Sequence, residues 1–266
     1  MTRRLGLIGL AAASLSMMSC EAVKDVKDKI AGLLNPLVGQ GIVLGIEAPD
    51  SDLIDLSTTK YKEGTSVNIF LADAKELDDM ENAPVSGADV VVDGNIEVSV
   101  DEGATDGLYA INPGDTDLAY TDNQEWTVTI TRTPEEGDAI VSTVNMALPV
   151  GADLVVPAAH TANTDLVVNF PAGFHAALIV VLDANGSITY SNEPQDIKGV
   201  YDFATGDDEI TEETIPGTAF PGDSAYLVGV APMVHTLAED IDSMNTALSK
   251  FFTGQMSFYA TVVGVP

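Results

Sequence analysis

Cysteine is almost absent from this chain of 266 residues, in which Cys20 is the only one. A single cysteine cannot form a disulfide within the chain, so hydrophobic cores must stabilise the folded part. Hydrophobic residues make up 45% of the sequence, which supplies the material for such cores. The length suits one large domain or two ordinary ones.

Basic residues are also scarce: 11 Lys and Arg stand against 41 Asp and Glu, for a formal net charge of −30. Nucleic-acid binding depends on cationic side chains that displace counterions from phosphates. A chain this acidic repels a phosphate backbone, so we expect no nucleic-acid partner.

Catalytic motifs are missing as well. His160, His175 and His235 lie far apart in the sequence and outside any metal-binding His motif, and there is no Gly-x-Ser-x-Gly elbow or phosphate-binding loop. We therefore expect no enzymatic activity. An envelope hydrolase with a carboxylate pair assembled by the fold stays open, because with 41 acidic residues close pairs arise easily.

The only long apolar run lies at the N-terminus, from Leu5 to Leu15. It follows Arg3 and Arg4 and precedes small residues, which is the order of a secretory signal. The run is shorter than the roughly 20 residues that span a bilayer. The sequence therefore predicts a signal peptide over residues 1–19.

The end of this signal resembles the lipobox of bacterial lipoproteins, with the sequence Leu15-Ser16-Met17-Met18-Ser19-Cys20. Ser19 and Cys20 match the pattern, whereas Met17 and Met18 depart from it. The resemblance implies that Cys20 is acylated (palmitate is a typical chain), becomes the first mature residue and anchors the protein to a membrane. Ordinary cleavage and an uncleaved anchor are the alternatives.

Glu21 follows the cysteine. The lipoprotein resemblance associates aspartate at this position with inner-membrane retention, so it implies an outer-membrane, cell-envelope location for this chain. A periplasmic and a surface-facing orientation are both open.

Residues 20–40 are predicted to form a helical tether or linker. Apolar residues recur there at steps of three and four from Ala22 to Leu37, with Lys and Asp on the other face, and Pro36 should end the helix. The helix either docks on its own domain, forms a mobile linker, lies near the bilayer or pairs with a partner.

Beyond residue 41 the hydrophobic period becomes two, as in Val67, Ile69 and Leu71. Short strands separated by Gly, Asp, Asn and Pro predict a mostly β fold of antiparallel sandwiches. A break near residues 147–151 divides the region into two tandem β-sandwich domains, residues 41–150 and 151–266.

One stretch of the first domain resembles the carboxypeptidase-regulatory-like and related bacterial Ig-like domains. The residues that carry the resemblance are Pro84-Val85-Ser86-Gly87-Ala88-Asp89-Val90-Val91-Val92, Gly107-Leu108-Tyr109-Ala110, Tyr120 and Trp126-Thr127-Val128-Thr129-Ile130. The resemblance implies an Ig-like sandwich used for adhesion, spacing or glycan contact, and it carries no catalytic residues.

Two hairpins are predicted from turn chemistry. A three-residue loop pairs Val92 with Ile96 and Val90 with Val98, and puts Asn95 in the left-handed conformation. A four-residue loop from Asp183 to Gly186 pairs residue 181 with 188, so that Asp183 and Asn185 are turn formers.

One helix is predicted near the C-terminus. Apolar residues fall at steps of four and three behind Thr236, a suitable N-cap, namely Leu237, Ile241, Met244, Leu248 and Phe251. This stripe should cover one end of the second sandwich, and a partner-binding groove or lid is the alternative.

Carboxylates are the weak metal candidates: Asp101 with Glu102 and Asp106, and Asp115 with Asp117. Ca²⁺ takes six to eight oxygen ligands, but none of these spacings is that of an EF-hand or a repeat-type calcium loop. The simpler explanation of the acidic surface is solubility or salt adaptation.

Exposed aromatic rings would indicate a carbohydrate-binding face. The candidates are Tyr61, Tyr109, Tyr120, Trp126, Tyr190, Tyr201, Tyr226 and Tyr259. At 6% aromatic, most of them are needed in the cores.

Together these features predict a non-enzymatic cell-envelope lipoprotein that acts as a binding, adhesion or spacer module. Its partners would be the membrane, through the acyl anchor, and an envelope protein or a glycan. A carbohydrate- or calcium-binding accessory module is the first alternative, and the hydrolase is the second. No cofactor is expected unless Ca²⁺ binds.

Overall fold

The computed structural model describes residues 37–49, 54–57, 59–121, 123–133, 138–147, 154–194, 199–200, 203 and 209–264. Strands dominate, so the predicted mostly β class is confirmed. The strands are β1 (Leu37–Ile46), β2 (Gly64–Asp73), β3 (Asp89–Asp93), β4 (Glu97–Val100), β5 (Leu108–Ile111), β6 (Trp126–Arg132), β7 (Ile140–Met146), β8 (Ala159–Thr161), β9 (Leu166–Asn169), β10 (Ala176–Asp183), β11 (Ile188–Ser191), β12 (Glu212–Ile215), β13 (Ser224–His235), β14 (Ile241–Asp242) and β15 (Lys250–Gly264). Short 3-10 helices are η2 (Leu77–Asn82), η3 (Gly217–Ala219) and η4 (Ala238–Asp240).

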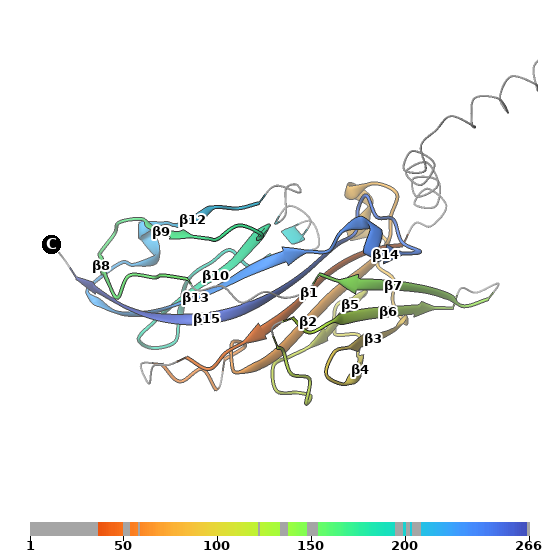
Figure 1. The fold of residues 1–266 in the computed structure, drawn as a ribbon, viewed down its shortest axis with the longest axis horizontal. Coiled ribbons are helices and arrows are strands. Elements are labelled where there is room, and N and C mark those ends of the chain that lie inside the picture. The colour runs from red at the N-terminus through yellow and green to blue at the C-terminus, as the bar shows by residue number, and fades with distance from the viewer. Residues whose placement is uncertain are drawn as a thin grey trace, which may run out of the picture.

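One eight-stranded sheet runs through the molecule (Figure 1). Its order is β11-β10-β13-β15-β1-β2-β5, and β8 pairs with the end of β15. The 15-residue β15 lies antiparallel to β13, while β1 pairs in parallel with its first half. At about 3.3 Å per residue, β15 extends about 50 Å and spans both sandwiches.

The first sandwich forms where the five-stranded sheet β14-β7-β6-β3-β4 packs on β1, β2 and β5. Alternate residues of β2 and β6 are buried in its core, as the period of two predicted: Val67, Ile69, Leu71, Trp126, Val128 and Ile130. The segment after β4 turns into the long sheet, since the Ala110 N–H donates to the Asp101 carbonyl at 3.1 Å. The outer side of β5 is therefore covered.

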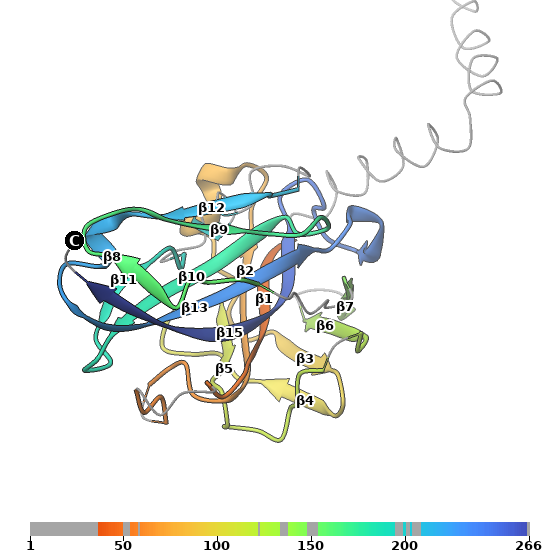
Figure 2. The same ribbon diagram turned by 60° about the vertical axis from the view of Figure 1, so that its left-hand side comes forward.

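The second sandwich forms where the two-stranded sheet β12-β9 covers β10 and β13 (Figure 2). The core between these layers includes Leu166, Val168, Ile179, Val228 and Phe220. The fold is thus a pair of sandwiches that share one long sheet, in agreement with the predicted sandwich class.

A third core lies on the opposite face of the long sheet. Phe251 and Val263 of β15 point into the first and second cores, whereas the even-numbered Phe252 and Met256 point into the third. Ile54, Leu56 and Tyr61 of the β1–β2 connection cover this face. Because successive strand residues alternate between faces, β15 contributes to all three cores.

The predicted limits of the tether and of the two domains differ from those in the structure. Residues 1–36, with the signal peptide, Cys20 and most of the tether, lie outside the described residues. Residues 37–40 begin β1 and are strand, not helix. The limit at residues 150 and 151 does not separate the sandwiches, because strands from both predicted domains enter one sheet and Phe251 packs in the first core.

The helix predicted behind Thr236 is wrong. Residues 238–240 form η4, Ile241 pairs with Val144 of β7, and Lys250 begins β15. Ser243 has a φ of 58°, which a right-handed helix does not allow. The apolar spacing arises because Ile241, Met244 and Phe251 all enter the first core from non-helical backbone.

The β3–β4 hairpin forms in a different register from the predicted one. Val92 pairs with Val98 and Val90 with Val100, two residues further along than predicted. These four valines still face the core, whereas Ile96 is 39% exposed. Asn95 does not adopt a left-handed φ. Its side chain instead accepts from the Ala119 N–H at 2.8 Å and donates to the Asp117 carbonyl at 3.2 Å.

The β10–β11 hairpin also differs in register. Leu182 pairs with Ile188 and Val181 with Tyr190, with an irregularity between them. The turn role of Asp183 is confirmed, because its carboxylate accepts from the N–H groups of Asn185 at 2.8 Å and Ser187 at 2.9 Å. These hydrogen bonds lower the pKa of Asp183, with that from Ser187 the largest cause.

Within the described ranges, none of the helices has the length and apolar character that crossing a bilayer requires.

Candidate functional site

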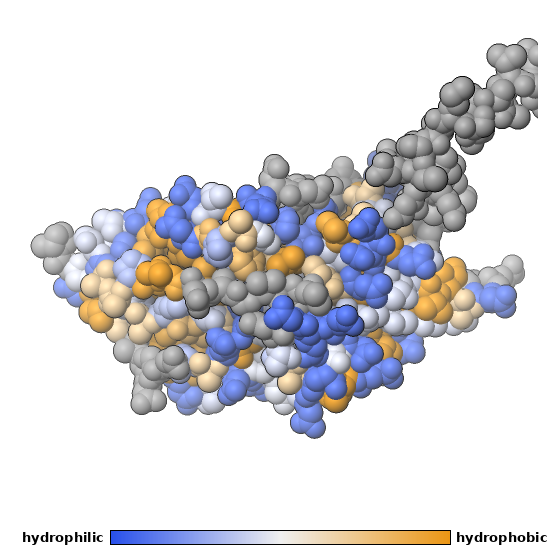
Figure 3. All heavy atoms as spheres, viewed as in Figure 1, coloured by the Kyte–Doolittle hydropathy of each residue, from blue (hydrophilic) through white to orange (hydrophobic). Residues whose placement is uncertain are grey.

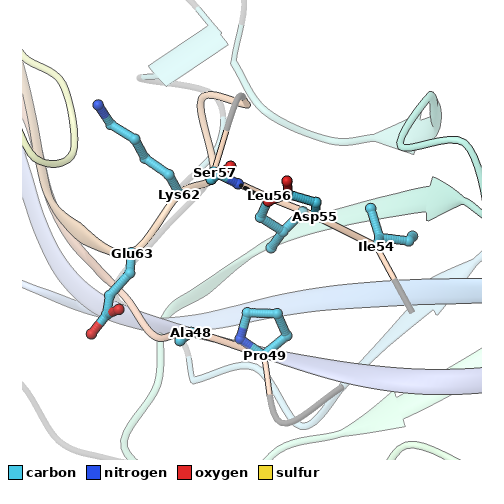
Figure 4. A pocket seen from close by; sticks show the side chains of 8 residues that line it. All are labelled: Ala48, Pro49, Ile54, Asp55, Leu56, Ser57, Lys62 and Glu63. Atoms are coloured by element: carbon cyan, nitrogen blue, oxygen red, sulfur yellow. Dashed lines mark hydrogen bonds between the residues drawn. The ribbon is translucent and has the colours of Figure 1, made fainter. Parts of the chain in front are cut away.

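An open pocket of about 480 Å³ lies in the β1–β2 connection (Figure 4). Its lining combines apolar and charged side chains: Ala48, Pro49, Ile54, Asp55, Leu56, Ser57, Lys62 and Glu63. Lys62 and Glu63 point in opposite directions in Figure 4. The Ser57 N–H donates to Asp55 at 2.9 Å, and the pKa of Asp55 is lowered, first by the Ser57 hydroxyl and then by this N–H.

Two groups of contacts fix this connection onto the long sheet. Glu47 accepts hydrogen bonds from Gln255 at 2.6 Å and Ser257 at 2.7 Å. Glu193, just beyond β11, forms an ion pair with Lys60 and accepts from the Tyr61 hydroxyl at 3.2 Å. Burial and then the Glu193 charge raise the pKa of Tyr61. The pocket wall therefore depends on contacts between segments far apart in sequence.

The side chains that line this pocket could contact a small bound molecule. Its lining combines apolar side chains with two carboxylates and the Lys62 ammonium, and none of its lining residues is a histidine or cysteine. The arrangement is that of a shallow recess with charged walls.

A second recess, of about 450 Å³, lies beside the start of β15 and includes His235, Glu239 and Lys250. His175 meets His235 behind it: the rings are 6.2 Å apart, and the His235 N–H donates to His175 Nδ1 at 3.5 Å. His160 instead packs against Phe220, with ring centroids 4.9 Å apart. The fold thus brings two of the three histidines together.

The predicted metal residues do not converge within the described ranges, where no group of three or more His, Cys, Asp or Glu is placed to hold an ion. Asp115 accepts a hydrogen bond from Asn112 at 3.0 Å and lies 3.9 Å from Lys62 Nζ. Asp101 and Asp117 bond through their backbone carbonyls. Asp106 is exposed in the turn before β5.

The aromatic candidates lie mainly in the cores. Tyr61, Tyr109, Trp126 and Tyr226 are buried. Three more are partly buried and pack on the cores, namely Tyr120, Tyr190 and Tyr259, while Tyr201 lies outside the described residues. These burial values place the rings in the packing, as the low aromatic content suggested.

A network of hydrogen bonds fixes the segments that carry the Ig-like resemblance. The buried Tyr109 hydroxyl accepts from the Ala88 N–H at 2.9 Å and donates to the Val85 carbonyl at 3.0 Å. The Glu102 carboxylate accepts from Gly107 N–H at 2.7 Å and Gly87 N–H at 2.9 Å. Both glycines have φ above 70°, which other residues rarely adopt.

The same network sets two pKa shifts. The Gly107 N–H, the Ser86 hydroxyl and the Gly87 N–H all hold the pKa of Glu102 below its usual value, and Gly107 is the largest cause. Burial raises the pKa of Tyr109. Glu102, suggested by sequence as a calcium ligand with Asp101 and Asp106, thus bonds to two turns instead.

Replacing Glu102 with Gln is expected to cost stability at neutral pH and progressively less in acid. A carboxyl whose pKa is lowered by folding contributes stability above its unfolded pKa, and this contribution is lost as pH falls through the folded value. We expect the Tm gap between wild type and Glu102→Gln to be widest at neutral pH and to close once Glu102 is protonated.

The control is Glu97→Gln, which removes an exposed carboxyl on β4. Differential scanning calorimetry across the acid range measures both gaps. A Glu102→Gln gap that is the same at neutral and acid pH would contradict the proposed role of the carboxylate.

Sequence reasoning missed Glu47 and Glu193, which hold the pocket connection. Their partners lie 208 and 132 positions away in the chain. No local pattern marks such contacts, because the residues next to Glu47 and Glu193 in sequence resemble those around an ordinary surface carboxylate. For Glu102, one partner, Gly107, lies five positions later in the sequence, whereas the other, Gly87, lies 15 positions earlier.

Comparison with known proteins gave no match to a family model and no match among curated proteins. Among solved structures, the chain is similar to a biofilm-associated protein BSP domain (13% identity, 76% of this chain and 28% of that chain, TM-score 0.22). It is also similar to the FN1–FN3 domains of chicken CNTN1 (11% identity, 74% and 62%, TM-score 0.18). A third is a tetra-tandem repeat in the extending region of a large adhesion protein (14% identity, 85% and 50%, TM-score 0.20).

The chain spans between 28% and 62% of the length of these structures. TM-scores near 0.2 carry no argument about detailed fold or function. The class that the strands and cores define is a mostly β protein built from β-sandwiches.

Proposed function

We propose that the chain is an outer-membrane lipoprotein, anchored through Cys20, whose β-structured part binds or spaces and does not catalyse. The support for the anchor comes from the sequence, where a charged, apolar and small-residue order ends at the single cysteine. The support for a binding or spacing role comes from how the chain runs through the sandwiches.

The observation that supports the spacing role is the position of the start of β1 in the long sheet. β1 begins at Leu37, and Gln40 pairs with Lys250 at the start of β15. From there β15 runs to Gly264 beside β8, at the opposite end of the long sheet (Figure 1). The far end of the second sandwich therefore lies about 50 Å from the start of β1, the described end that is nearer to Cys20 in sequence.

A protein partner fits this module better than a glycan. Sugar recognition relies on exposed rings, and the described aromatic candidates are buried or pack on the cores. Extended strands with exposed edges, by contrast, offer backbone groups to another chain. Labelling of intact cells would distinguish a surface-facing module from a periplasmic one.

Cys20→Ala is expected to move the protein from the membrane fraction to the soluble fraction of a bacterial host. The thiol is the acceptor of the diacylglyceryl group, so its loss removes the acyl chains. Globomycin should cause the unprocessed precursor to accumulate. Fractionation with immunoblotting measures the first effect, and intact mass measures the acyl chains and the precursor.

Ser19→Ala is the matched control, because it keeps a small residue before the cysteine and should leave processing unchanged. The anchoring proposal fails if the wild-type protein carries no acyl mass, or if Cys20→Ala fractionates like wild type.

A further inference from the structure

As far as the described ranges extend, the outer edge of β9 in the second sandwich is open. β9 pairs with β12 along one side, with Val168 opposite Glu213 and Leu166 opposite Ile215. Within the described residues no strand pairs with its other side, because the sheet contains only β12 and β9. A two-stranded sheet is marginal alone and gains from a third strand.

The hydrogen-bond pattern shows which backbone groups face outward. Phe170 N–H donates to the Thr211 carbonyl at 2.9 Å, so residues 170 and 211 form a hydrogen-bonded pair. Hydrogen-bonded and non-hydrogen-bonded pairs alternate along antiparallel strands, so Val168 and Leu166 also form hydrogen-bonded pairs with β12. Val167 and Asn169 therefore direct their N–H and C=O groups away from β12. In the described part of the chain these four groups have no hydrogen-bond partner.

The other sheet edges carry protection against strand addition. β5 is covered by residues 101–103, and β11 has an irregular register with β10. Acidic residues lie on the remaining edge strands β4, β12 and β14, and the three-residue β8 is short. β9, with the sequence Leu-Val-Val-Asn, has no charge, proline or bulge.

Exposed apolar side chains accompany this edge. Val167 of β9 is 42% exposed, and Val155 is 82% exposed in a segment whose neighbours Leu154 and Val156 pack on the same core as β9. Figure 3 shows hydrophobic residues gathered on the surface around β9 and hydrophilic ones along β12. An added strand would cover apolar side chains as well as satisfy the backbone.

Charge selects the occupant. Asp165 precedes β9, and Glu212 and Glu213 lie on β12 beside it. A second copy of this chain would bring another net charge of about −30 to the same edge, which disfavours self-pairing. A cationic strand would be attracted instead.

We propose that the open edge of β9 binds an extended segment of a partner protein, with apolar and polar residues in alternation and Lys or Arg at its ends. Backbone hydrogen bonds to Val167 and Asn169 provide the pairing, and the neighbouring carboxylates select the charge. This proposal rests on the proposed binding role of the chain and names the surface that would carry out that role. It is tested on the soluble chain from residue 21, so the anchoring result does not bear on it.

The probe is a capped hexapeptide of sequence KVTVTK, titrated by calorimetry and by NMR hydrogen exchange. We expect binding that weakens with added salt, and slower exchange of the Val167 and Asn169 amides when the peptide is present. The peptide EVTVTE, in which charge is reversed, and KVTPTK, in which a backbone N–H is lost, should bind about tenfold more weakly or not at all.

Asn169→Pro removes one outward N–H from β9, while Thr214→Pro removes one outward N–H from β12. Proline is tolerated at such edge positions. We expect Asn169→Pro to weaken KVTVTK binding about tenfold and Thr214→Pro to leave it unchanged. If either proline variant unfolds, Val167→Lys replaces it, with Val141→Lys on β7 as the control of similar exposure.

Three results would overturn the proposal. The first is no binding of KVTVTK to the folded chain at millimolar concentration. The second is equal weakening by the β9 variants and their controls. The third is strong protection of the Val167 and Asn169 amides in the free chain, which would mean that the chain's own residues already cover this edge.

Discussion

Phe251→Ala is expected to lower the free energy of unfolding by about 3–5 kcal/mol, the usual cost of removing a fully buried aromatic ring. Phe251 has no exposed surface and packs in the first core. Its ring lies over Gly39 and Gly41 of β1, where an added Cβ would come within 2.7 Å and 2.6 Å of it. Since neither glycine has a side chain to fill the space, the cavity would remain.

Urea unfolding, followed by the fluorescence of Trp126, measures this loss. Leu237→Ala is the control, because Leu237 is 53% exposed and its truncation should change the free energy by less than about 0.5 kcal/mol. Equal effects of the two substitutions would mean that Phe251 does not fill the first core as described.

Gly41→Val is expected to destabilise the fold by about 3 kcal/mol, at the upper end of the cost of overpacking. The new Cβ would lie 2.6 Å from Phe251 Cε1, in a core that leaves the ring nowhere to move. Thermal and urea unfolding of the purified variant measure the cost.

Gly222→Val is the matched control, since an added Cβ there meets no atom within 4 Å. The double variant Gly41→Val with Phe251→Ala tests the cause directly. We expect it to be more stable than the sum of the single effects implies, because valine occupies part of the space that the ring leaves. Additive losses would show that the two positions do not compete for one volume.

Alternation of apolar and polar residues made much of the sheet predictable. Val67, Ile69 and Leu71 are buried on one face of β2, and Trp126, Val128 and Ile130 are buried on β6. Hairpin registers were off by one or two positions, because side chains outside the hairpin decide them. Asn95, for example, is held by residues 117 and 119.

The central strand β1 could not be recognised in the same way. Its sequence Leu-Val-Gly-Gln-Gly-Ile-Val-Leu-Gly-Ile contains three glycines, which weaken a strand on its own, and residues 37–40 are assigned by sequence to the helical tether. In the fold, Gly39 and Gly41 make room for the Phe251 ring and Gly45 for that of Tyr120. The rings that justify these glycines come from distant parts of the chain, so local sequence could not show the fit.

The site residues could likewise be predicted where their contacts are local in sequence, and not where their partners are distant. The turn role of Asp183 was predictable from its neighbours, because its hydrogen bonds are local. The Glu193 contact with Tyr61 was not, since it joins residues 132 positions apart. The apolar spacing from Leu237 to Phe251 gave a wrong helix prediction for a related reason. Ile241, Met244 and Phe251 are buried by tertiary packing and not along the face of a helix.

The parallel pairing of β1 with β15 has a consequence for how the polypeptide reaches its final form. The first described strand finds its neighbour about 210 positions later, a separation recorded also by the Gly39 to Ser249 hydrogen bond. Contacts of such high sequence separation slow folding, since a large loop must close before they form. While the chain folds, β1 therefore keeps one side unpaired until the last strand is available, and a protein shortened before residue 250 would lack the middle of its sheet and not merely a margin.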